Sequence, residues 1–235
     1  MKTHDYSLYA KDYAKLGLTQ TYYLAFRDIP FILREYGKSD AKVLDYGCGT
    51  GRSLRFIRDL GYSDIVGVDI SNDMINEAVK IDPNGKYKVI ESAKIPYEDN
   101  TFDIIFMSYV FLEVGDINEI IKILKEFKRV LKQDGHIIFI TSIVTDIKDK
   151  WLSFSYDFEE NNKDLSKCQT LKLLIKDKNI ILHDYNWSKK EYENAIDSAG
   201  LKLEKLHIPL GTEYDPYKWL DETTKGYKHI YILSK

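Results

Sequence analysis

Short apolar runs alternate with amphipathic stretches along the first 140 residues or so of the chain. Apolar side chains dominate at 43–46, 65–69, 87–90, 103–108 and 136–141. Near-continuous runs of this length predict parallel strands buried on both faces. Apolar residues recur at helical spacing over 53–60, between Ser71 and Pro83, and over 117–131. The alternation therefore predicts an α/β fold with a doubly wound sheet.

The pattern changes after the fifth predicted strand. Leu152, Phe154, Tyr156 and Phe158 alternate with polar residues, and two further strands are predicted at 171–175 and 180–185, joined by a turn at 176–179. This period of two predicts an antiparallel β cap inserted after strand 5. A helix is expected over 188–199, ended by Gly200, and the runs 201–208 and 227–233 alternate like an antiparallel edge pair. The main sheet would then have seven strands, mostly parallel, with the last one antiparallel.

A glycine-rich turn follows the first predicted strand. Gly47, Gly49 and Gly51 come directly after Asp45, and the helix expected near Thr50 would point its free N–H groups at the turn. Glycines let a ligand approach the backbone closely. A second acid, Asp69, ends the next strand. The spacing is G-x-G-x-G, which differs from the G-x-G-x-x-G fingerprint of dinucleotide-binding folds. We therefore expect a nucleotide-like ligand at this turn.

Four segments together resemble class I S-adenosylmethionine-dependent methyltransferases. They are Asp45–Gly51, Val66–Ser71, Ile95–Asp103 with the strand to Tyr109, and Val130–Ile140. The resemblance is close over roughly 40–142 and looser beyond. It implies a Rossmann-like fold and S-adenosylmethionine as cofactor, with S-adenosylhomocysteine as product. It does not specify the methyl acceptor.

The resemblance also implies roles for individual residues. Asp69 would hold both ribose hydroxyls, although an acid at this point could instead cap a helix. Asp45 would organise the glycine loop and face the cofactor's amino group, directly or through water, or would serve as a buried structural acid. The remaining residues expected at the cofactor are Tyr13, Gly47, Cys48, Gly49, Gly51, Ile70, Met74, Ser92, Ala93 and Ser108.

Several of these assignments have competing interpretations. Ser92-Ala93 stands where the family often has Asp-Ala, so the adenine contact could fall to Ser92, Glu91 or backbone. Ile70 and Met74 would line the adenine slot or belong to the core. Tyr13 resembles an N-terminal tyrosine that covers the methionine part of the cofactor in relatives, but the chain has 18 tyrosines. Arg27 could meet the cofactor's carboxylate or lie exposed on its helix.

Candidates for the acceptor side are few. Tyr109, with Ser108, ends strand 4 beneath the expected methyl group. His183, Tyr185 and Trp187 alternate along a cap strand, so Tyr185 and Trp187 could wall a substrate pocket and His183 could act as a general base. A single histidine in a cap strand is usually structural. The other histidines, His4, His136, His207 and His229, lack the spacing of metal ligands, so no metal is predicted.

Length and composition narrow the class of protein. With 235 residues we expect one methyltransferase domain: an N-terminal helical lid at 4–36, a cofactor-binding core at 40–142, a substrate cap at 143–187, and a C-terminal helix with antiparallel strands at 188–235. The net charge of −3 makes nucleic acid an unlikely principal substrate. Two cysteines 120 positions apart, no signal peptide and no bilayer-length apolar run predict a cytoplasmic protein without a membrane segment.

The sequence thus predicts a methyltransferase that moves a methyl group to an N, O or C atom of a small molecule by in-line displacement. The aromatic cap at 151–187 favours a small acceptor. Two alternatives remain open: a non-catalytic protein that binds S-adenosylmethionine, and an NAD-dependent oxidoreductase on a similar fold. The oligomeric state is not predicted.

Overall fold

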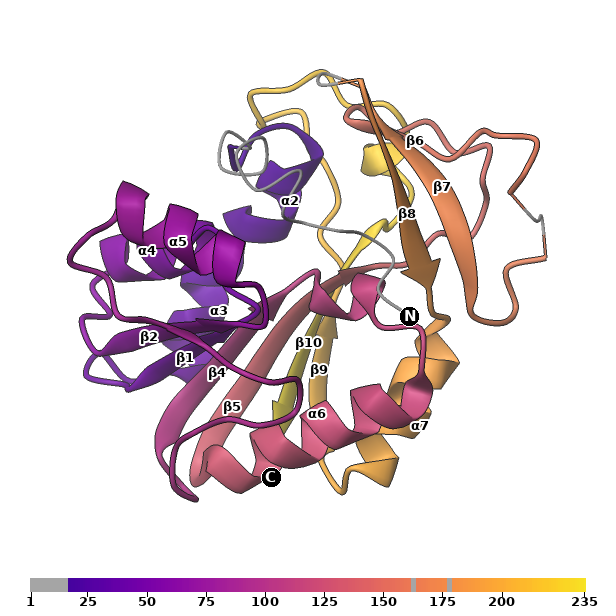
Figure 1. Cartoon of the computed structure of the whole chain (residues 1–235). Helices are drawn as coiled ribbons and strands as arrows, with labels where there is room; N and C mark the ends of the chain where they lie inside the picture. Colours follow the sequence, from indigo (N-terminus) through magenta and orange to yellow (C-terminus); the bar gives the residue numbers. More distant parts are fainter. Residues whose placement is uncertain (1–16, 162–163, 177–178) are drawn as a thin grey trace.

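A seven-stranded sheet forms the centre of the molecule (Figure 1). The computed structural model describes residues 17–161, 164–176 and 179–235. The strand order is β3-β2-β1-β4-β5-β10-β9, and β10 runs antiparallel to both of its neighbours. The strands are β1 (Val43–Tyr46), β2 (Ile65–Asp69), β3 (Tyr87–Val89), β4 (Phe102–Ser108), β5 (Leu131–Ser142), β9 (Lys202–His207) and β10 (Lys228–Ser234). The predicted doubly wound, mostly parallel fold is confirmed.

Helices cover both faces of this sheet. One core lies between the sheet and α2 (Thr21–Arg27), α3 (Ile29–Tyr36) and α4 (Arg52–Asp59). The other lies against α6 (Ile117–Val130), α7 (Lys189–Ser198) and the short η1 (Val110–Glu113). The helix α5 (Asn72–Ile81) packs on β2 and β3, and a second short 3₁₀ helix, η2, spans Asp221–Thr223.

Alternation along the central strands explains why their sequences are apolar throughout. In β1, Val43 contributes to the core beneath α3 and α4, whereas Leu44 contributes to the core beneath α6. Ile104 and Ile105 divide in the same way in β4. The prediction fails only at β3, where Lys88 and Val89 are exposed. This three-residue strand lies at the edge of the sheet, so it needs little apolar surface.

The helix ends follow from local chemistry. Ser71 caps α5 by accepting a hydrogen bond from the Met74 N–H, and Ser188 forms a capping box with Glu191 at the start of α7. Gly61 and Gly200 take left-handed conformations just after α4 and α7, as expected of residues that end helices. The helix after the glycine turn begins at Arg52, slightly later than predicted.

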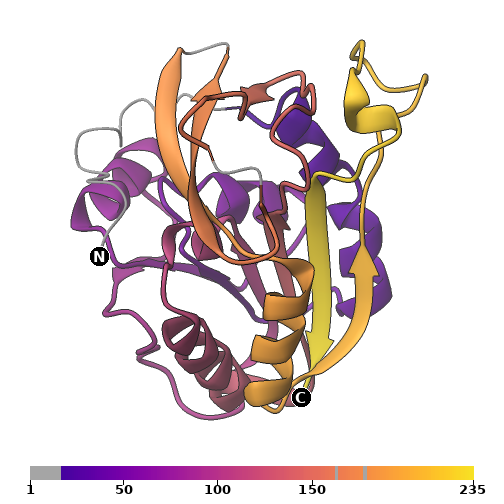
Figure 2. The same cartoon turned by 90° about the vertical axis from the view of Figure 1, so that its right-hand side faces the viewer.

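The inserted segment forms a second, three-stranded antiparallel sheet of β6 (Phe154–Ser155), β7 (Gln169–Ile175) and β8 (Ile180–Asn186) (Figure 2). It has its own apolar core. The strand predicted over 152–158 shrinks to two residues. The reason is that the N–H groups of Leu152 and Ser153 donate to the Glu222 and Thr21 side chains instead of to a neighbouring strand.

The C-terminal strands also differ from an edge pair. β9 is the edge strand, but β10 lies between β5 and β9 and is buried over Lys228–Leu233. A strand in this position has both faces and both edges covered. Lys228, which a two-stranded edge would leave in solvent, is therefore buried.

Candidate functional site

One large cavity opens where the central strands end. It has a volume of about 720 Å³ and extends from the carboxyl ends of β1, β2 and β4 to the inner face of the cap sheet. Ligands of open α/β sheets bind at this edge. The first wall comes from the glycine loop and the loop after β2. The second comes from the cap and from β10, through Phe154, Leu173, Leu182, Asp184 and Lys228 among others.

The glycine loop is held against the end of β2. The N–H groups of Gly47 and Cys48 both donate to the Val68 carbonyl, at 2.7 and 3.0 Å. Gly47 has a φ of 67°, and a Cβ there would lie 2.1 Å from Val110 Cγ2. A Cβ on Gly51, at φ 78°, would lie 2.3 Å from the Tyr87 hydroxyl. These two positions therefore require glycine.

Asp69 joins the glycine loop to the start of α5. One carboxylate oxygen accepts from the Gly49 N–H and the other from the Ser71 N–H, each at 2.8 Å. Ser71, and not Asp69, is the N-cap of α5. Asp69 lines the cavity and is 9% exposed. The two backbone bonds fix the orientation of this carboxylate at the cavity wall.

Asp45 lies beneath the loop and is absent from the cavity wall. It is fully buried, and one oxygen accepts a 2.6 Å hydrogen bond from the Ser53 hydroxyl in α4. Burial raises the pKa of this carboxyl to about 7. The predicted direct contact with the cofactor's amino group does not fit this placement. The alternative interpretation, a buried structural acid, does.

The other predicted cofactor residues divide into three groups. The cavity wall includes Cys48, Ile70, Met74, Ser92 and Ser108, and also Tyr109, which was predicted on the acceptor side. Ala93 is not part of it: its N–H donates to the Tyr46 hydroxyl at 3.2 Å, beneath the Ser92 turn. Ser92 itself donates to Glu119, at 2.7 Å. Tyr13 falls outside the described residues.

The residues of β8 that were predicted on the acceptor side do not line the cavity, because their side of the strand faces away from it. His183 is exposed and pairs in register with Lys172, away from the cavity. Leu182 and Asp184, at the alternate positions, line the cavity instead.

Tyr185 and Trp187 support the loop before α6 and do not wall the pocket. A Cβ on Gly115 would lie 2.2 Å from the Tyr185 ring, which shows how closely the ring covers this backbone. The Trp187 indole N–H donates to the Val114 carbonyl at 2.8 Å. Both belong to the core beneath α6 and α7.

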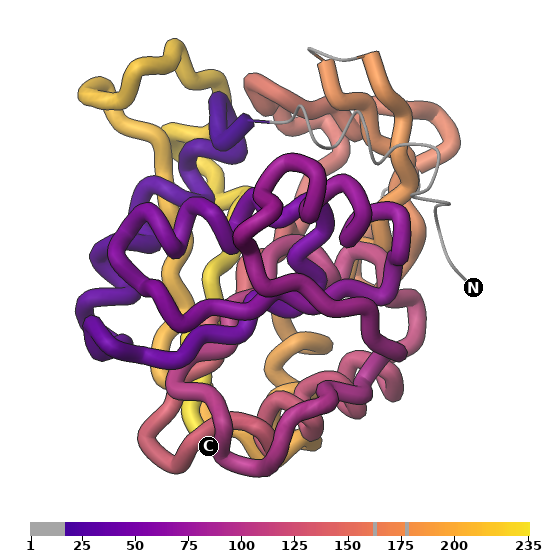
Figure 3. Tube along the Cα trace, turned by 60° about the vertical axis from the view of Figure 1, so that its left-hand side comes forward, coloured from indigo at the N-terminus to yellow at the C-terminus, as the bar shows by residue number. Residues whose placement is uncertain are grey.

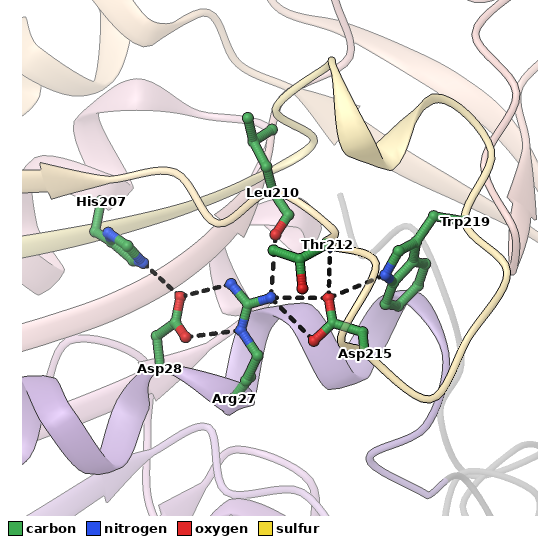
Figure 4. Close-up of polar contacts among 7 residues, drawn as sticks. All are labelled: Arg27, Asp28, His207, Leu210, Thr212, Asp215 and Trp219. Atoms are coloured by element: carbon green, nitrogen blue, oxygen red, sulfur yellow. Dashed lines mark hydrogen bonds and ion pairs between the residues drawn. The ribbon is translucent and has the colours of Figure 1, made fainter.

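Arg27 is also placed differently from the expectation that it meets the cofactor. The N-terminal helices and the segment after β9 lie side by side (Figure 3), and Arg27 joins them by bonding Asp28, Asp215 and the Leu210 carbonyl (Figure 4). Burial alone would raise the pKa of Asp28, but hydrogen bonds from His207 and Arg27 hold it below its usual range. Arg27 is therefore a structural cation.

Sequence reasoning missed three charged residues of the cavity wall. Arg52, Asp184 and Lys228 all line the cavity. Lys228, Ile230 and Ile232 are alternate residues of β10, so their side chains lie on the same face of the strand. This alternation is the only sequence signal that Lys228 points inward. That signal has meaning only once β10 is known to be an inner strand.

The described ranges contain neither a membrane-spanning helix nor a cluster of metal-binding side chains. No helix there is long and apolar enough to cross a bilayer. Nor do the described parts of the chain bring three or more histidine, cysteine or acidic side chains together as a metal site would require.

Comparison with known proteins now identifies the fold and the domain. Residues 44–139 match the model of a family described as a methyltransferase domain. An uncharacterised protein of Methanocaldococcus jannaschii is 29% identical over 202 residues, which cover 84% of this chain and 75% of that protein. The ubiquinone/menaquinone biosynthesis C-methyltransferase of Campylobacter jejuni is 30% identical over 115 residues, 46% of this chain and 48% of that enzyme. The match thus spans about half of that relative's length.

Solved structures extend the likeness to almost the whole chain. A protein of Pyrococcus horikoshii has a TM-score of 0.63 at 22% identity, covering 95% of this chain and 98% of that one. The methyltransferase seen in complex with the Trm112 methyltransferase activator of Haloferax volcanii has a TM-score of 0.67 at 18% identity, covering 98% and 97%. At such identities these likenesses show the fold alone. Residues 44–139 thus form a methyltransferase domain, and the chain resembles class I S-adenosylmethionine-dependent methyltransferases in sequence and in fold.

Proposed function

We propose that this protein transfers a methyl group from S-adenosylmethionine to an N, O or C nucleophile of a small molecule by in-line displacement. One observation carries the proposal. The Asp69 carboxylate, fixed by the Gly49 and Ser71 N–H groups, faces the same cavity as the glycine loop. A rigid carboxylate beside side-chain-free backbone suits a ribose and the group attached to it.

The residues of the first wall fit an adenosyl group. Asp69 would accept hydrogen bonds from both ribose hydroxyls. A Cβ on Gly49 would meet no atom within 4 Å, so the backbone borders open space there. Ile70, which is 47% exposed, and Met74 would contact the adenine faces, and Ser92 would lie at its rim. Asp45 would act indirectly, by holding Ser53 at the start of α4.

When bound, S-adenosylmethionine supplies a methyl group already activated on a sulfonium sulfur, and S-adenosylhomocysteine is the product. The main tasks of the chain are then to align the acceptor with that methyl group and to exclude water. The cap, proposed as residues 143–187, offers Phe154, Leu173 and Leu182 to the cavity and so favours a small, largely apolar acceptor. The names of relatives that methylate quinones or phosphoethanolamine also support a small acceptor.

Calorimetry with S-adenosylmethionine and, separately, with NAD tests the cofactor. We expect binding of the first and none of the second, because the glycine spacing departs from the dinucleotide fingerprint. Binding of NAD alone would refute the proposal in favour of oxidoreduction. Transfer of a labelled methyl group to a panel of small metabolites then tests catalysis. Cofactor binding without transfer to any panel member would favour a non-catalytic binding protein.

A further inference from the structure

We propose that Lys228 is the proton acceptor of the methyl-acceptor site, and that this site takes an apolar ring bearing a weakly acidic hydroxyl, such as a phenol or an enol. The inference rests on the proposed function, because it concerns the second reactant of the same transfer. It arises from a buried lysine that no part of the cofactor site needs.

Lys228 lies in the second wall of the cavity, at the first position of β10. The residue is 2% exposed, yet it lines the cavity. Its amino group donates one hydrogen bond, to the Ser142 hydroxyl at 3.0 Å, and no carboxylate of the described residues lies within ion-pair distance. An ammonium group has three N–H donors, so a single neutral partner compensates its charge poorly.

Four aromatic rings surround this amino group. Their centroids lie 4.3 Å (Tyr227), 4.4 Å (Tyr109), 5.0 Å (Phe154) and 5.2 Å (Tyr22) from Nζ. Aromatic faces stabilise a cation but remove no proton from it. The surroundings can therefore accommodate an ammonium once it forms, while the exclusion of water favours the amine before that. A general base needs both properties.

The charged groups near Lys228 also bear on its role as a proton acceptor. Burial lowers the pKa of Lys228 well below its usual value; Asp184 on β8 opposes the shift and Arg52 on α4 adds to it. Burial also raises the pKa of Asp184 far above its usual value, and Glu113 in η1 adds to that shift. Burial thus disfavours the charged form of both groups.

The tyrosines around the amine do not compete for its role. Burial raises the pKa values of Tyr109 and Tyr227, so both remain protonated phenols. Lys228 is left as the group with an available lone pair.

The same wall indicates the chemical class of the acceptor. Leu173, Ile175 and Leu182 from the cap sheet face the cavity together with the four rings, which suits a flat apolar molecule. A neutral molecule that loses a proton when it reacts complements the amine.

The step is a simple proton transfer. The O–H bond of the acceptor breaks, its proton goes to the lone pair on Lys228 Nζ, and the electron pair stays on the acceptor as the nucleophile that receives the methyl group. The resulting ammonium is held by the four rings and Ser142, and it returns its proton to water when the product leaves. No reactant beyond those of the proposed transfer is required.

The first test measures the protonation of Lys228 directly. In protein labelled with ¹³C at the lysine Cε, the Lys228 resonance is identified by its loss in Lys228→Met and followed as a function of pH. Lys205→Met is the matched control, since Lys205 lies exposed on the neighbouring strand, paired with Glu35. We expect Lys228 to titrate well below Lys205. An inflection at the ordinary lysine value of about 10.4 would overturn the proposal.

The second test uses 4-nitrophenol, whose phenolate absorbs visible light. At a pH where the free phenol is mostly protonated, the wild type and Lys205→Met should bind it as the phenolate, whereas Lys228→Met should not generate the phenolate signal. Equal spectra for wild type and Lys228→Met, or no uptake by the wild type, would overturn the proposal. Circular dichroism and S-adenosylmethionine calorimetry on each variant separate these outcomes from misfolding. If the wild type does not bind S-adenosylmethionine, the proposed function is refuted, but the two tests of Lys228 can still be interpreted.

Discussion

Replacing Asp45 with Asn should change how the stability of this protein depends on pH. Asp45 is fully buried and accepts a hydrogen bond from Ser53, and its burial raises the carboxyl pKa from 3.8 to about 7. Between these two values the folded protein holds a proton that the unfolded chain has lost. The free energy of unfolding therefore falls as pH rises through this window, because the folded state is the better proton binder.

The size of the effect follows from the shift. One pKa unit corresponds to about 1.4 kcal/mol, so the full difference between the two pKa values of Asp45 lowers the free energy of unfolding by about 4 kcal/mol. About 3 kcal/mol of this decrease falls between about pH 5 and about pH 8. His229 acts in the opposite direction, since burial lowers its pKa to about 4 and stability rises with pH up to its ordinary value. The wild-type curve alone therefore does not isolate Asp45, but the difference between variant and wild type does.

The assay is urea unfolding of Asp45→Asn and of wild type at a series of pH values, without cofactor. Asn keeps an oxygen for Ser53 and cannot ionise, so the variant should gain about 3 kcal/mol relative to wild type from about pH 5 to about pH 8. Asp134→Asn, which removes an exposed carboxylate, is the matched control and sets the baseline. A difference for Asp45→Asn that does not exceed this baseline would refute the reasoning and mean that this carboxyl ionises normally.

Three further predictions concern the loop, the cap and the N-terminal helices. Gly51→Ala places a Cβ at a left-handed φ, 2.3 Å from the Tyr87 hydroxyl. Urea unfolding should therefore show a free energy of unfolding lower by more than about 1 kcal/mol. An unchanged value would mean that the turn relaxes freely. His183→Gln should leave methyl transfer within about twofold of wild type, because His183 is exposed outside the cavity; a loss near the general-base range of about 100-fold would contradict its placement. Arg27→Met leaves Asp28 and Asp215 without their guanidinium partner. Thermal unfolding should therefore show a free energy of unfolding lower by about 1–3 kcal/mol. An unchanged midpoint would show that the ion pairs contribute nothing.

Much of the fold could be predicted because the local signals agree with each other. The ends of β1 and β2 were predicted to the residue, since the apolar runs are bounded by Asp45-Tyr46 before the glycine turn and by Asp69. Ser71, Gly61 and Gly200 mark helix ends through side-chain or backbone chemistry that acts within a few residues. The β7–β8 hairpin was also predicted from its alternation and turn.

Long-range placement could not be predicted in the same way. A period of two tells that His183 and Asp184 face opposite sides of β8, but not which side faces the cavity. Lys228 is buried only because β10 inserts between β5 and β9, a pairing between segments far apart in sequence. The strand expected over 152–158 is cut short because the Leu152 and Ser153 N–H groups donate to the side chains of Glu222 and Thr21, which lie near opposite ends of the chain.

The central claim is that the carboxylate of Asp69 and the glycine loop hold the adenosyl part of S-adenosylmethionine. Calorimetry on wild type, Asp69→Ala and Asp64→Ala tests it most directly, because Asp64 precedes the same strand and pairs with Lys86 on the surface. Two hydroxyl bonds to a charged group contribute about 1.5–3 kcal/mol each, so Asp69→Ala should bind the cofactor at least about 100-fold more weakly while Asp64→Ala binds it like wild type. Equal affinity for all three proteins would contradict the account.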